Sequence, residues 1–346
     1  MTEIKVSFLD LQPRYQEERE YLLAIFDRTL ASGHLVGTPE IADFEAEVVA
    51  FTGAGHCVSL NSGTDALMTA LWGCGIGKGD EVITTPISFV ATTGAIMHVG
   101  AVPVYVDVGE DQNIDVEKVE ARITDKTKAI MPVHWGGRFA NMAAISDIAE
   151  RHGLDVIEDS AQSMGARYHG RHGGTMGRVG AVSCHPLKNL NAIGDSGFLL
   201  TDDVDLAEKV RMFRNHGLAG RDDCAFYGIN SRMDVLNAQV LSYRLGRLQN
   251  VIAKRRHNAN LYRELISAEA VFIPNDPADE DNSYVMFLVQ AERRDELQAH
   301  LADNGIQALV YYGTPLHLHR AAADLGYRRG DLPVAENQAD KVLALP

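Results

Sequence analysis

The sequence has few cysteines and no long apolar run. Its four cysteines lie far apart and show no CxxC spacing, which is typical of reduced thiols and argues against a disulfide framework or a zinc site. No segment is apolar over enough residues to span a bilayer, and the N-terminus lacks the cationic start and apolar core of a signal peptide. We therefore expect a cytoplasmic protein that has no membrane partner.

Positive charge is also scarce. The chain has 32 lysines and arginines against 47 acidic residues, a formal net charge of −15. Such a chain repels phosphate backbones, so we expect no nucleic-acid partner, and an anionic ligand needs a local site. The pairs His317/His319 and His169/His172 have conceivable metal spacing but no clustered acidic or thiol partners. We expect no metal and interpret these as surface or substrate-loop histidines.

The length of 346 residues and a hydrophobic content of 46% suffice for one large and one smaller domain. Short β-branched runs alternate with helical patterns such as 142–153, where apolar residues recur three and four apart. This alternation predicts an α/β fold with a mainly parallel sheet between two layers of helices, and ligands at the carboxyl ends of the strands. The candidate strands are 81–86, 102–108, 128–135, 154–159, 180–184 and 197–202.

The pattern changes after residue 202. Residues 236–265 have the periodicity of one long helix. Beyond Pro274 the pattern predicts a strand at 284–290, a helix at 294–305 and a strand at 306–312. We expect these segments to form a smaller α+β domain.

One lysine stands in a suggestive place. Lys188, in SCHPLKNL, follows the apolar run of a predicted buried strand, although most lysines are solvated and carry no chemistry. Asp159 ends the predicted strand at 154–159, 29 residues earlier, so two neighbouring strands could deliver both groups to one cleft. The alternative for Asp159 is a carboxylate that caps the next turn.

Other motifs allow a binding interpretation beside a structural one. NSGTDALMTALWGCG, at 61–75, opens a helix on small residues, which makes either a phosphate seat or simply a good helix cap. Phe89 follows a predicted strand end, where its ring could stack on a flat cofactor or pack in the core. In YGINSRMD, Asn230 and Arg232 could reach an anion or tie down a loop.

Together these parts fit the chemistry of pyridoxal 5′-phosphate (PLP). That cofactor needs a lysine for a Schiff base, a carboxylate near its pyridine nitrogen, a phosphate seat and a flat group against its ring. An aspartate at the nitrogen favours the pyridinium form, in which the ring draws electrons from a substrate carbanion.

The motifs EDSAQ, SCHPLKNL, RNHG and GDLPVAE resemble those of the DegT/StrS aminotransferases, and the resemblance runs from FLDLQ at residue 8 to the end of the sequence. It implies the fold of type I PLP enzymes, with a seven-stranded sheet in a large domain at 13–250. A small domain would comprise 1–12 and 251–346. Members of the family normally carry a further helix beyond the position of Pro346.

The resemblance also implies roles for single residues. Lys188 would form the Schiff base, Asp159 would pair with the pyridinium, Gln162 would contact the region near the ring hydroxyl, and Phe89 would stack on the ring. The expected phosphate contacts are Gly63, Thr64 and Ser183, with Asn230 from the second subunit of a homodimer that shares its active sites. The expected substrate contacts are Arg232, Tyr312 and His317, with His319 and Arg320 as further candidates.

The leading hypothesis is a PLP-dependent aminotransferase that moves an amino group from glutamate or glutamine to a nucleotide-linked keto sugar. NSRMD resembles a turn found in enzymes that aminate C3, and Ser231 would leave room beside the cofactor, which favours a 3-keto sugar. Alternatives are a 4-keto sugar, a cyclitol ketone or an aminobenzoate precursor. Lys188 argues against the related dehydratases, which carry histidine there, and a non-catalytic PLP-binding regulator is the remaining alternative.

Two positions depart from the family pattern. Tyr311-Tyr312 stands where the family commonly has His-Tyr, and VHWGGR at 133–138 contains an unusual Trp135-Gly136 pair. We therefore expect a substrate contact that differs from that of other members.

Overall fold

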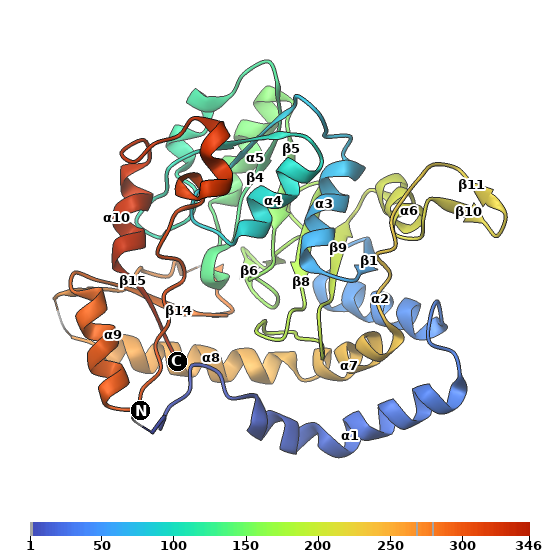
Figure 1. Cartoon of the computed structure of the whole chain (residues 1–346), viewed down its shortest axis with the longest axis horizontal. Coiled ribbons are helices and arrows are strands. Elements are labelled where there is room, and N and C mark those ends of the chain that lie inside the picture. Colours follow the sequence, from blue (N-terminus) through green and yellow to red (C-terminus); the bar gives the residue numbers. More distant parts are fainter. Residues whose placement is uncertain (1–2, 268, 279) are drawn as a thin grey trace.

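A seven-stranded sheet forms the centre of the molecule (Figure 1). The computed structural model describes residues 3–267, 269–278 and 280–346. The strand order is β1-β9-β8-β5-β4-β2-β3. In chain order the strands are β1 (His56–Leu60), β2 (Glu81–Thr84), β3 (Val102–Tyr105), β4 (Thr127–Met131), β5 (Asp155–Asp159), β8 (Val179–Ser183) and β9 (Gly197–Thr201).

The sheet is mainly parallel, as predicted. Strands β3, β2, β4, β5 and β8 pair in parallel, whereas β9 is antiparallel to β8 and β1 is antiparallel to β9. The six candidate strands from the sequence correspond to β2, β3, β4, β5, β8 and β9. Strand β1, with the sequence HCVSL, was not among them.

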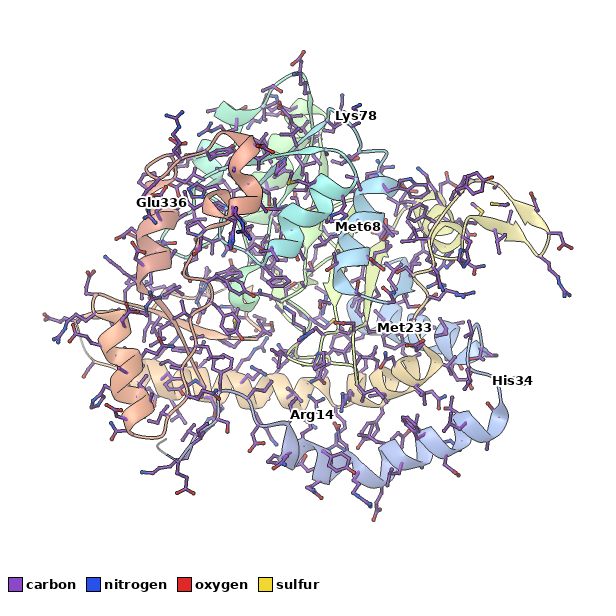
Figure 2. The ribbon with its side chains drawn as sticks, viewed as in Figure 1. Arg14, His34, Met68, Lys78, Met233 and Glu336 are labelled. Atoms are coloured by element: carbon purple, nitrogen blue, oxygen red, sulfur yellow. The ribbon has the colours of Figure 1, made fainter. Side chains whose placement is uncertain are left out.

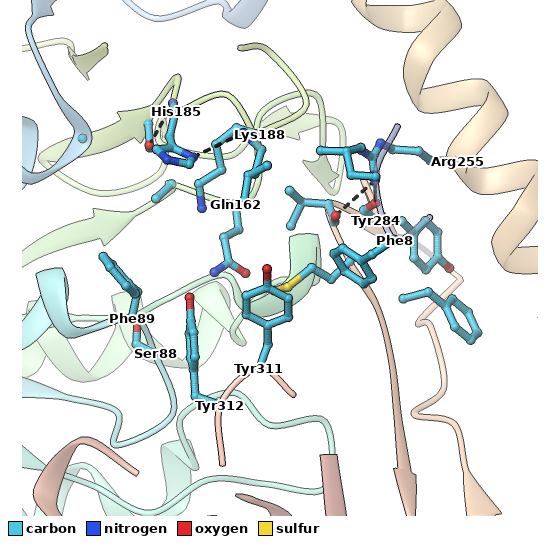
Figure 3. A pocket seen from close by; sticks show the side chains of 18 of the residues that line it. Phe8, Ser88, Phe89, Gln162, His185, Lys188, Arg255, Tyr284, Tyr311 and Tyr312 are labelled. Atoms are coloured by element: carbon cyan, nitrogen blue, oxygen red, sulfur yellow. Dashed lines mark hydrogen bonds between the residues drawn. The ribbon is translucent and has the colours of Figure 1, made fainter. Parts of the chain in front are cut away.

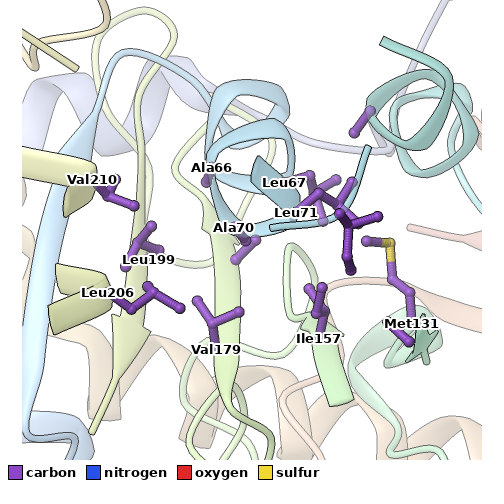
Figure 4. Close-up of a cluster of buried hydrophobic side chains, with 14 of the residues drawn as sticks. Ala66, Leu67, Ala70, Leu71, Met131, Ile157, Val179, Leu199, Leu206 and Val210 are labelled. Atoms are coloured by element: carbon purple, nitrogen blue, oxygen red, sulfur yellow. The ribbon is translucent and has the colours of Figure 1, made fainter. Parts of the chain in front are cut away.

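Both faces of the sheet are covered by helices, so successive strand residues are buried on opposite sides. On β4, Met131 belongs to the cluster on one face and Ile130 to a cluster on the other. Figure 4 shows the first face, where Leu67 and Leu71 of a helix lie over Ile157 and Val179. That face carries α3 (Gly63–Gly73), α4 (Val90–His98) and α6 (Val204–Phe213); the other carries α2 (Pro39–Thr52), α5 (Met142–His152) and α7 (Val235–Leu245).

The C-terminal part has a three-stranded sheet of its own, β12 (Val271–Phe272), β14 (Phe287–Ala291) and β15 (Val342–Leu345). Two predictions for this part were wrong. Segment 236–265 is two helices, because α7 ends at Leu245 and a turn at Gly246 and Arg247 separates it from α8 (Leu248–Leu265). Segment 306–312 forms only isolated bridges, since β14 takes β15 as its neighbour there.

The remaining elements lie at the edges of these layers. The helix predicted at 294–305 is confirmed as α9 (Arg294–Asp303). No helix among the described residues is both long and apolar enough to cross a membrane. The other elements are α1 (Leu11–Ser32), α10 (Pro333–Lys341), β6 (Arg167–Tyr168), β7 (Arg171–His172), β10 (Leu218–Gly220), β11 (Asp223–Cys224), β13 (Glu280–Asp281) and the 3₁₀ helices η1 (Val116–Lys118), η2 (Glu120–Arg122), η3 (Trp135–Gly137), η4 (Leu316–Leu318) and η5 (Arg320–Leu325).

A buried ion pair joins helix α1 to the loop that follows Lys188. Arg244 of α7 donates to Glu18 Oε2 from Nε and Nη2, at 3.1 and 2.6 Å. Its Nη1 donates to the carbonyl oxygens of Asn191 and Ala192, at 2.7 and 3.2 Å. Both charged residues are buried, and Arg14 of α1, labelled in Figure 2, adds a second cation to Glu18. The pair therefore anchors the loop that carries the lysine.

We expect Glu18→Ala to lower the free energy of unfolding by about 3–5 kcal/mol, because it leaves the Arg244 guanidinium buried without its carboxylate. Urea unfolding followed by circular dichroism measures this loss. Glu17→Ala is the matched control: Glu17 is on the same helix, exposed, and 3.9 Å from Arg247, so its removal should change stability by less than about 1 kcal/mol. Equal effects of the two substitutions would contradict the anchoring role.

Candidate active site

A cavity of about 810 Å³ opens at the carboxyl ends of the central strands. Figure 3 shows Lys188 and Gln162 extending from one side of it toward Phe89 and Tyr312 on the other. This is the edge at which a parallel sheet presents its ligand-binding groups. Of the residues predicted from the sequence, the cavity is lined by Gly63, Thr64, Phe89, Asp159, Gln162, Ser183, Lys188 and Tyr312.

Lys188 lies in the loop between β8 and β9, in a turn where its amide donates to the carbonyl of His185 at 2.8 Å. Its ammonium group faces the cavity, and desolvation by the surrounding protein lowers the pKa of Lys188 to about 8. The negative charge of Asp159 acts in the opposite direction. About a tenth of this amine is therefore unprotonated at pH 7 and about half at pH 8, and the unprotonated amine is the form that attacks a carbonyl.

Asp159 is the last residue of β5 and is 4% exposed. Its Oδ2 accepts a hydrogen bond from Thr92 Oγ1 at 2.7 Å, and its Oδ1 accepts one from the amide of Ala161 at 3.2 Å. Burial raises the pKa of Asp159, whereas these donors and the charge of Lys188 lower it. The Asp159 carboxylate is thus fixed by two hydrogen bonds and borders the same cavity as Lys188.

The N-terminus of α3 borders the same cavity. Ser62 caps this helix by accepting from the amide of Asp65 at 3.1 Å, and the amides of Gly63 and Thr64, in the first turn, have no acceptor within the helix. A Cβ at Gly63 would lie 2.6 Å from Ser183 Cβ, so only glycine allows this close approach to the end of β8. Two backbone donors and the Ser183 hydroxyl can therefore converge on an anion.

The unusual sequence VHWGGR positions Gln162. Gly136 and Gly137 have φ values of 68° and 95°, in the left-handed region that favours glycine. This turn brings the amide of Gly136 to Gln162 Oε1, at 2.7 Å. Since the carbonyl oxygen of that side chain is occupied, its NH₂ group is the part free to donate into the cavity.

Aromatic rings form the opposite wall. Phe89 precedes α4 and is half exposed, and its ring centroid lies 5.9 Å from that of Tyr312. Tyr311 packs edge-on against Tyr312 at 5.2 Å, and burial raises the pKa of the Tyr312 hydroxyl. The Tyr311-Tyr312 pair, which departs from the family pattern, therefore lies in the cavity wall.

The structure does not bring Asn230, Arg232 or His317 to this cavity. Arg232 donates to Asn215 Oδ1 at 3.0 Å, and Asn230 bridges the same residue. His317 is buried, with Nε2 at 3.1 Å from Glu336 on α10 (labelled in Figure 2).

The interpretation of the histidine pairs as surface or loop residues is wrong for His317 and His172. Both are buried, and His172 accepts the amide of Gly165 at 2.9 Å. No group of three or more potential metal ligands occurs among the described residues.

Ser231 does not leave room beside the cavity of its own chain. Ser231 is fully buried, and its hydroxyl donates to Asp65 Oδ2 at 2.6 Å. It stabilises the start of α3 and creates no space beside the cavity of its own chain.

Sequence reasoning missed further cavity residues. Thr92 stands three positions after Phe89 in α4, so helical periodicity could have placed both on one face. Ser88 precedes Phe89, and His185 stands between Ser183 and Lys188 in the same motif. Lys254 and Arg255 of α8 line the far end of the cavity, but nothing local in KRRH distinguishes them from solvated cations.

These features define the class of protein. A lysine of lowered pKa, a buried carboxylate, a helix N-terminus and an aromatic wall in one cavity at the carboxyl edge of a parallel sheet form the site of a PLP-dependent enzyme. The model of the DegT/DnrJ/EryC1/StrS aminotransferase family matches residues 16–346, and the chain belongs to this family.

The chain is similar to a protein named as a sugar transaminase and to one named as a regulatory protein. The chain is 42% identical to "dTDP-3-amino-3,4,6-trideoxy-alpha-D-glucose transaminase" of Streptomyces venezuelae, over 99% of this chain and 91% of that protein. It is 41% identical to a "Pleiotropic regulatory protein" of Geobacillus stearothermophilus, over 99% and 93%. The crystal structure of S. venezuelae DesV in complex with a ketimine intermediate superposes with a TM-score of 0.96 at 42% identity, covering 100% of this chain and 93% of DesV.

The residues present fit PLP. Gly63 lets the N-terminus of the helix approach Ser183, because a Cβ there would lie 2.6 Å from Ser183 Cβ. Asp159 would supply a buried carboxylate for the ring nitrogen, and Lys188 would supply the amine. The protein is a PLP-dependent aminotransferase.

We expect covalent capture of PLP by Lys188 to accelerate as the pH rises through about 8, because only the neutral amine attacks. Stopped-flow absorbance of the cofactor-free protein mixed with PLP gives this profile, and borohydride reduction with peptide mapping identifies the modified residue. Asp159→Asn should move the midpoint to lower pH, since it removes the charge that favours the ammonium form. A midpoint near that of an exposed lysine, or an adduct elsewhere, would refute the assignment.

Proposed function

We propose that the protein transfers an amino group from glutamate or glutamine to C3 of a nucleotide-linked 3-keto sugar. The observation that carries the proposal is the meeting of Lys188 and Asp159 in one cavity with the phosphate seat at α3. A cytoplasmic location belongs to the proposal and is supported by four free cysteines, which suit a reducing compartment.

PLP, when bound, supplies an electron sink beside the carbon that carries the amino group. Asp159 holds a negative charge where the ring nitrogen would lie, and so favours its protonated form. Lys188 Nζ would hold the cofactor and would be the base that removes and returns the proton at that carbon. The rings of Phe89 and Tyr312 would lie against the cofactor at this wall, and the first amides of α3 would bind its phosphate.

Ser231 does not support the choice of C3 within one chain, because its buried hydroxyl is directed at Asp65. The support that remains is the name of the S. venezuelae relative, which specifies a 3-amino sugar, together with the family resemblance of the NSRMD turn.

The nucleotide end of the substrate needs cations, given the net charge of −15. Lys254 and Arg255 line the cavity at the end away from Ser183, whereas Arg232 and His317 do not line it. Arg255 is fixed by donating from Nη1 to the carbonyls of Tyr284 and Val285, at 2.9 and 3.1 Å. We therefore assign the diphosphate to the α8 end of the cavity.

A homodimer with shared sites completes the proposal. Asn230, expected at the phosphate, lies outside the cavity of its own chain, which supports a contribution to the site of a second copy. Helix α1 also exposes large apolar side chains, which is typical of a contact surface. Those exposed by 40% or more are Leu11, Tyr15, Tyr21, Leu23, Phe26 and Leu30.

The substrate proposal predicts that the aminated cofactor form returns to the PLP spectrum faster with a 3-keto nucleotide sugar than with its 4-keto isomer. The enzyme is first converted with glutamate, then freed of the donor and mixed with each sugar separately. The free keto sugar without its nucleotide is the control for recognition by the α8 end, and should react at least about tenfold more slowly. A faster 4-keto reaction would overturn the choice of C3, a reaction with a cyclitol alone would overturn the sugar class, and no reaction with any ketone would favour a regulator.

The shared-site proposal predicts complementation between two impaired variants. In a hybrid of Lys188→Ala with Asn230→Ala, one of the two sites combines an intact lysine with an intact asparagine from the other chain. Mixed dimers should therefore recover up to half of the wild-type activity per dimer, as measured by glutamate-dependent amination. Hybrids that form, as shown by differential tagging, but recover nothing would refute the shared site.

A further inference from the structure

Asp159 is attached to a chain of two hydroxyl groups. Thr92 Oγ1 donates to Asp159 Oδ2 at 2.7 Å, and Ser88 Oγ lies 2.6 Å from Thr92 Oγ1. All three residues border the cavity, and each is at most 5% exposed. Ser88 precedes Phe89, and Thr92 lies in the first turn of α4. One short segment therefore carries both the Phe89 ring and the two hydroxyl groups that lead to Asp159.

The direction of the chain follows from proton count. An ionised carboxylate can only accept hydrogen bonds, so the single hydroxyl proton of Thr92 is donated to Asp159. The bond between the two hydroxyls must then be donated by Ser88. Successive donors in one direction polarise each other, which strengthens the bond that reaches the carboxylate.

Thr92 differs from three other buried threonines in helices of this protein. Thr29, Thr52 and Thr69 donate to carbonyls three or four residues earlier in their own helices, those of Ile25, Val48 and Ala66. That local bond is the usual one for a helical threonine. The Thr92 hydroxyl instead crosses from α4 to the end of β5, 67 residues away in the sequence.

The surroundings of Asp159 explain why such donors matter. Burial opposes its negative charge, and the charged or titratable groups that face it from neighbouring segments are Lys188, His134 and Tyr312. The remaining fixed donor to its carboxylate is the amide of Ala161. Each oxygen thus has one protein donor, and its remaining lone pairs are available to the cavity.

We propose that Thr92, with Ser88 behind it, is a positioning residue that keeps Asp159 ionised and oriented toward the ring nitrogen of PLP. The proposal extends the role assigned to Asp159 and needs no particular sugar. Thr92 acts only through the carboxylate.

The test uses the PLP-loaded protein with Thr92→Val, which keeps the shape but removes the hydroxyl. We expect the half-reaction with glutamate to slow about tenfold, in line with the loss of one hydrogen bond to a charged group. We also expect the pH midpoint of the visible absorbance to rise, because a ring that holds its nitrogen proton less firmly withdraws fewer electrons from the Schiff base to Lys188. Ser88→Ala should produce a smaller change of the same sign.

Two matched variants separate positioning from packing. Thr92→Ser restores the hydroxyl and should restore both rate and midpoint. Thr93→Val removes the hydroxyl of the next residue in α4, which is bonded to the Tyr105 hydroxyl at 2.8 Å, and should leave the midpoint unchanged.

A midpoint in Thr92→Val equal to that of the wild type, or an equal shift in Thr93→Val, would overturn the proposal. Asp159→Asn serves as the reference: if it leaves the midpoint unchanged, the assignment of Asp159 itself fails. Because no keto sugar takes part, the outcome is independent of the proposed substrate.

Discussion

The site depends on keeping two opposite charges in a desolvated cavity. Burial alone would neutralise both Asp159 and Lys188, raising the pKa of the first and lowering that of the second. The hydrogen bonds to Asp159 oppose the rise of its pKa. For Lys188, the attraction of Asp159 opposes the lowering of the pKa by burial. The result is an anion beside an amine that titrates near neutral pH, which is the combination that PLP chemistry requires.

Backbone geometry provides the rest of the site. The first amides of α3 come within reach of Ser183 because residue 63 has no side chain. Gly136 orients Gln162 through its own amide. In both places a glycine allows the main chain to serve as a hydrogen-bond donor, so fewer side-chain cations are needed in a strongly acidic protein.

The sheet and the placing of Lys188 and Asp159 at its carboxyl edge were predictable from the sequence. Strands buried on both faces have a strong local signal, Asp159 ends β5, and Lys188 lies in the loop that follows β8. The hydrogen bond of the Thr92 hydroxyl was not predictable, since its partner is 67 residues away and the local sequence suits an ordinary helix. Strand β15 was missed for a related reason: its four residues become a strand only by pairing with β14. The roles of Arg232 and His317 were expected from family resemblance, and in this chain both side chains have partners outside the cavity.

The position of β9 has a consequence for the order in which the molecule matures. This strand lies between β1, which leads into the phosphate seat at α3, and β8, which leads into the lysine loop. A chain still emerging from the ribosome therefore has residues 56–64 long before the strand that anchors β1 to the sheet. A cofactor that contacts both segments would therefore bind only the completed chain, and its binding would add to the stability of the finished fold.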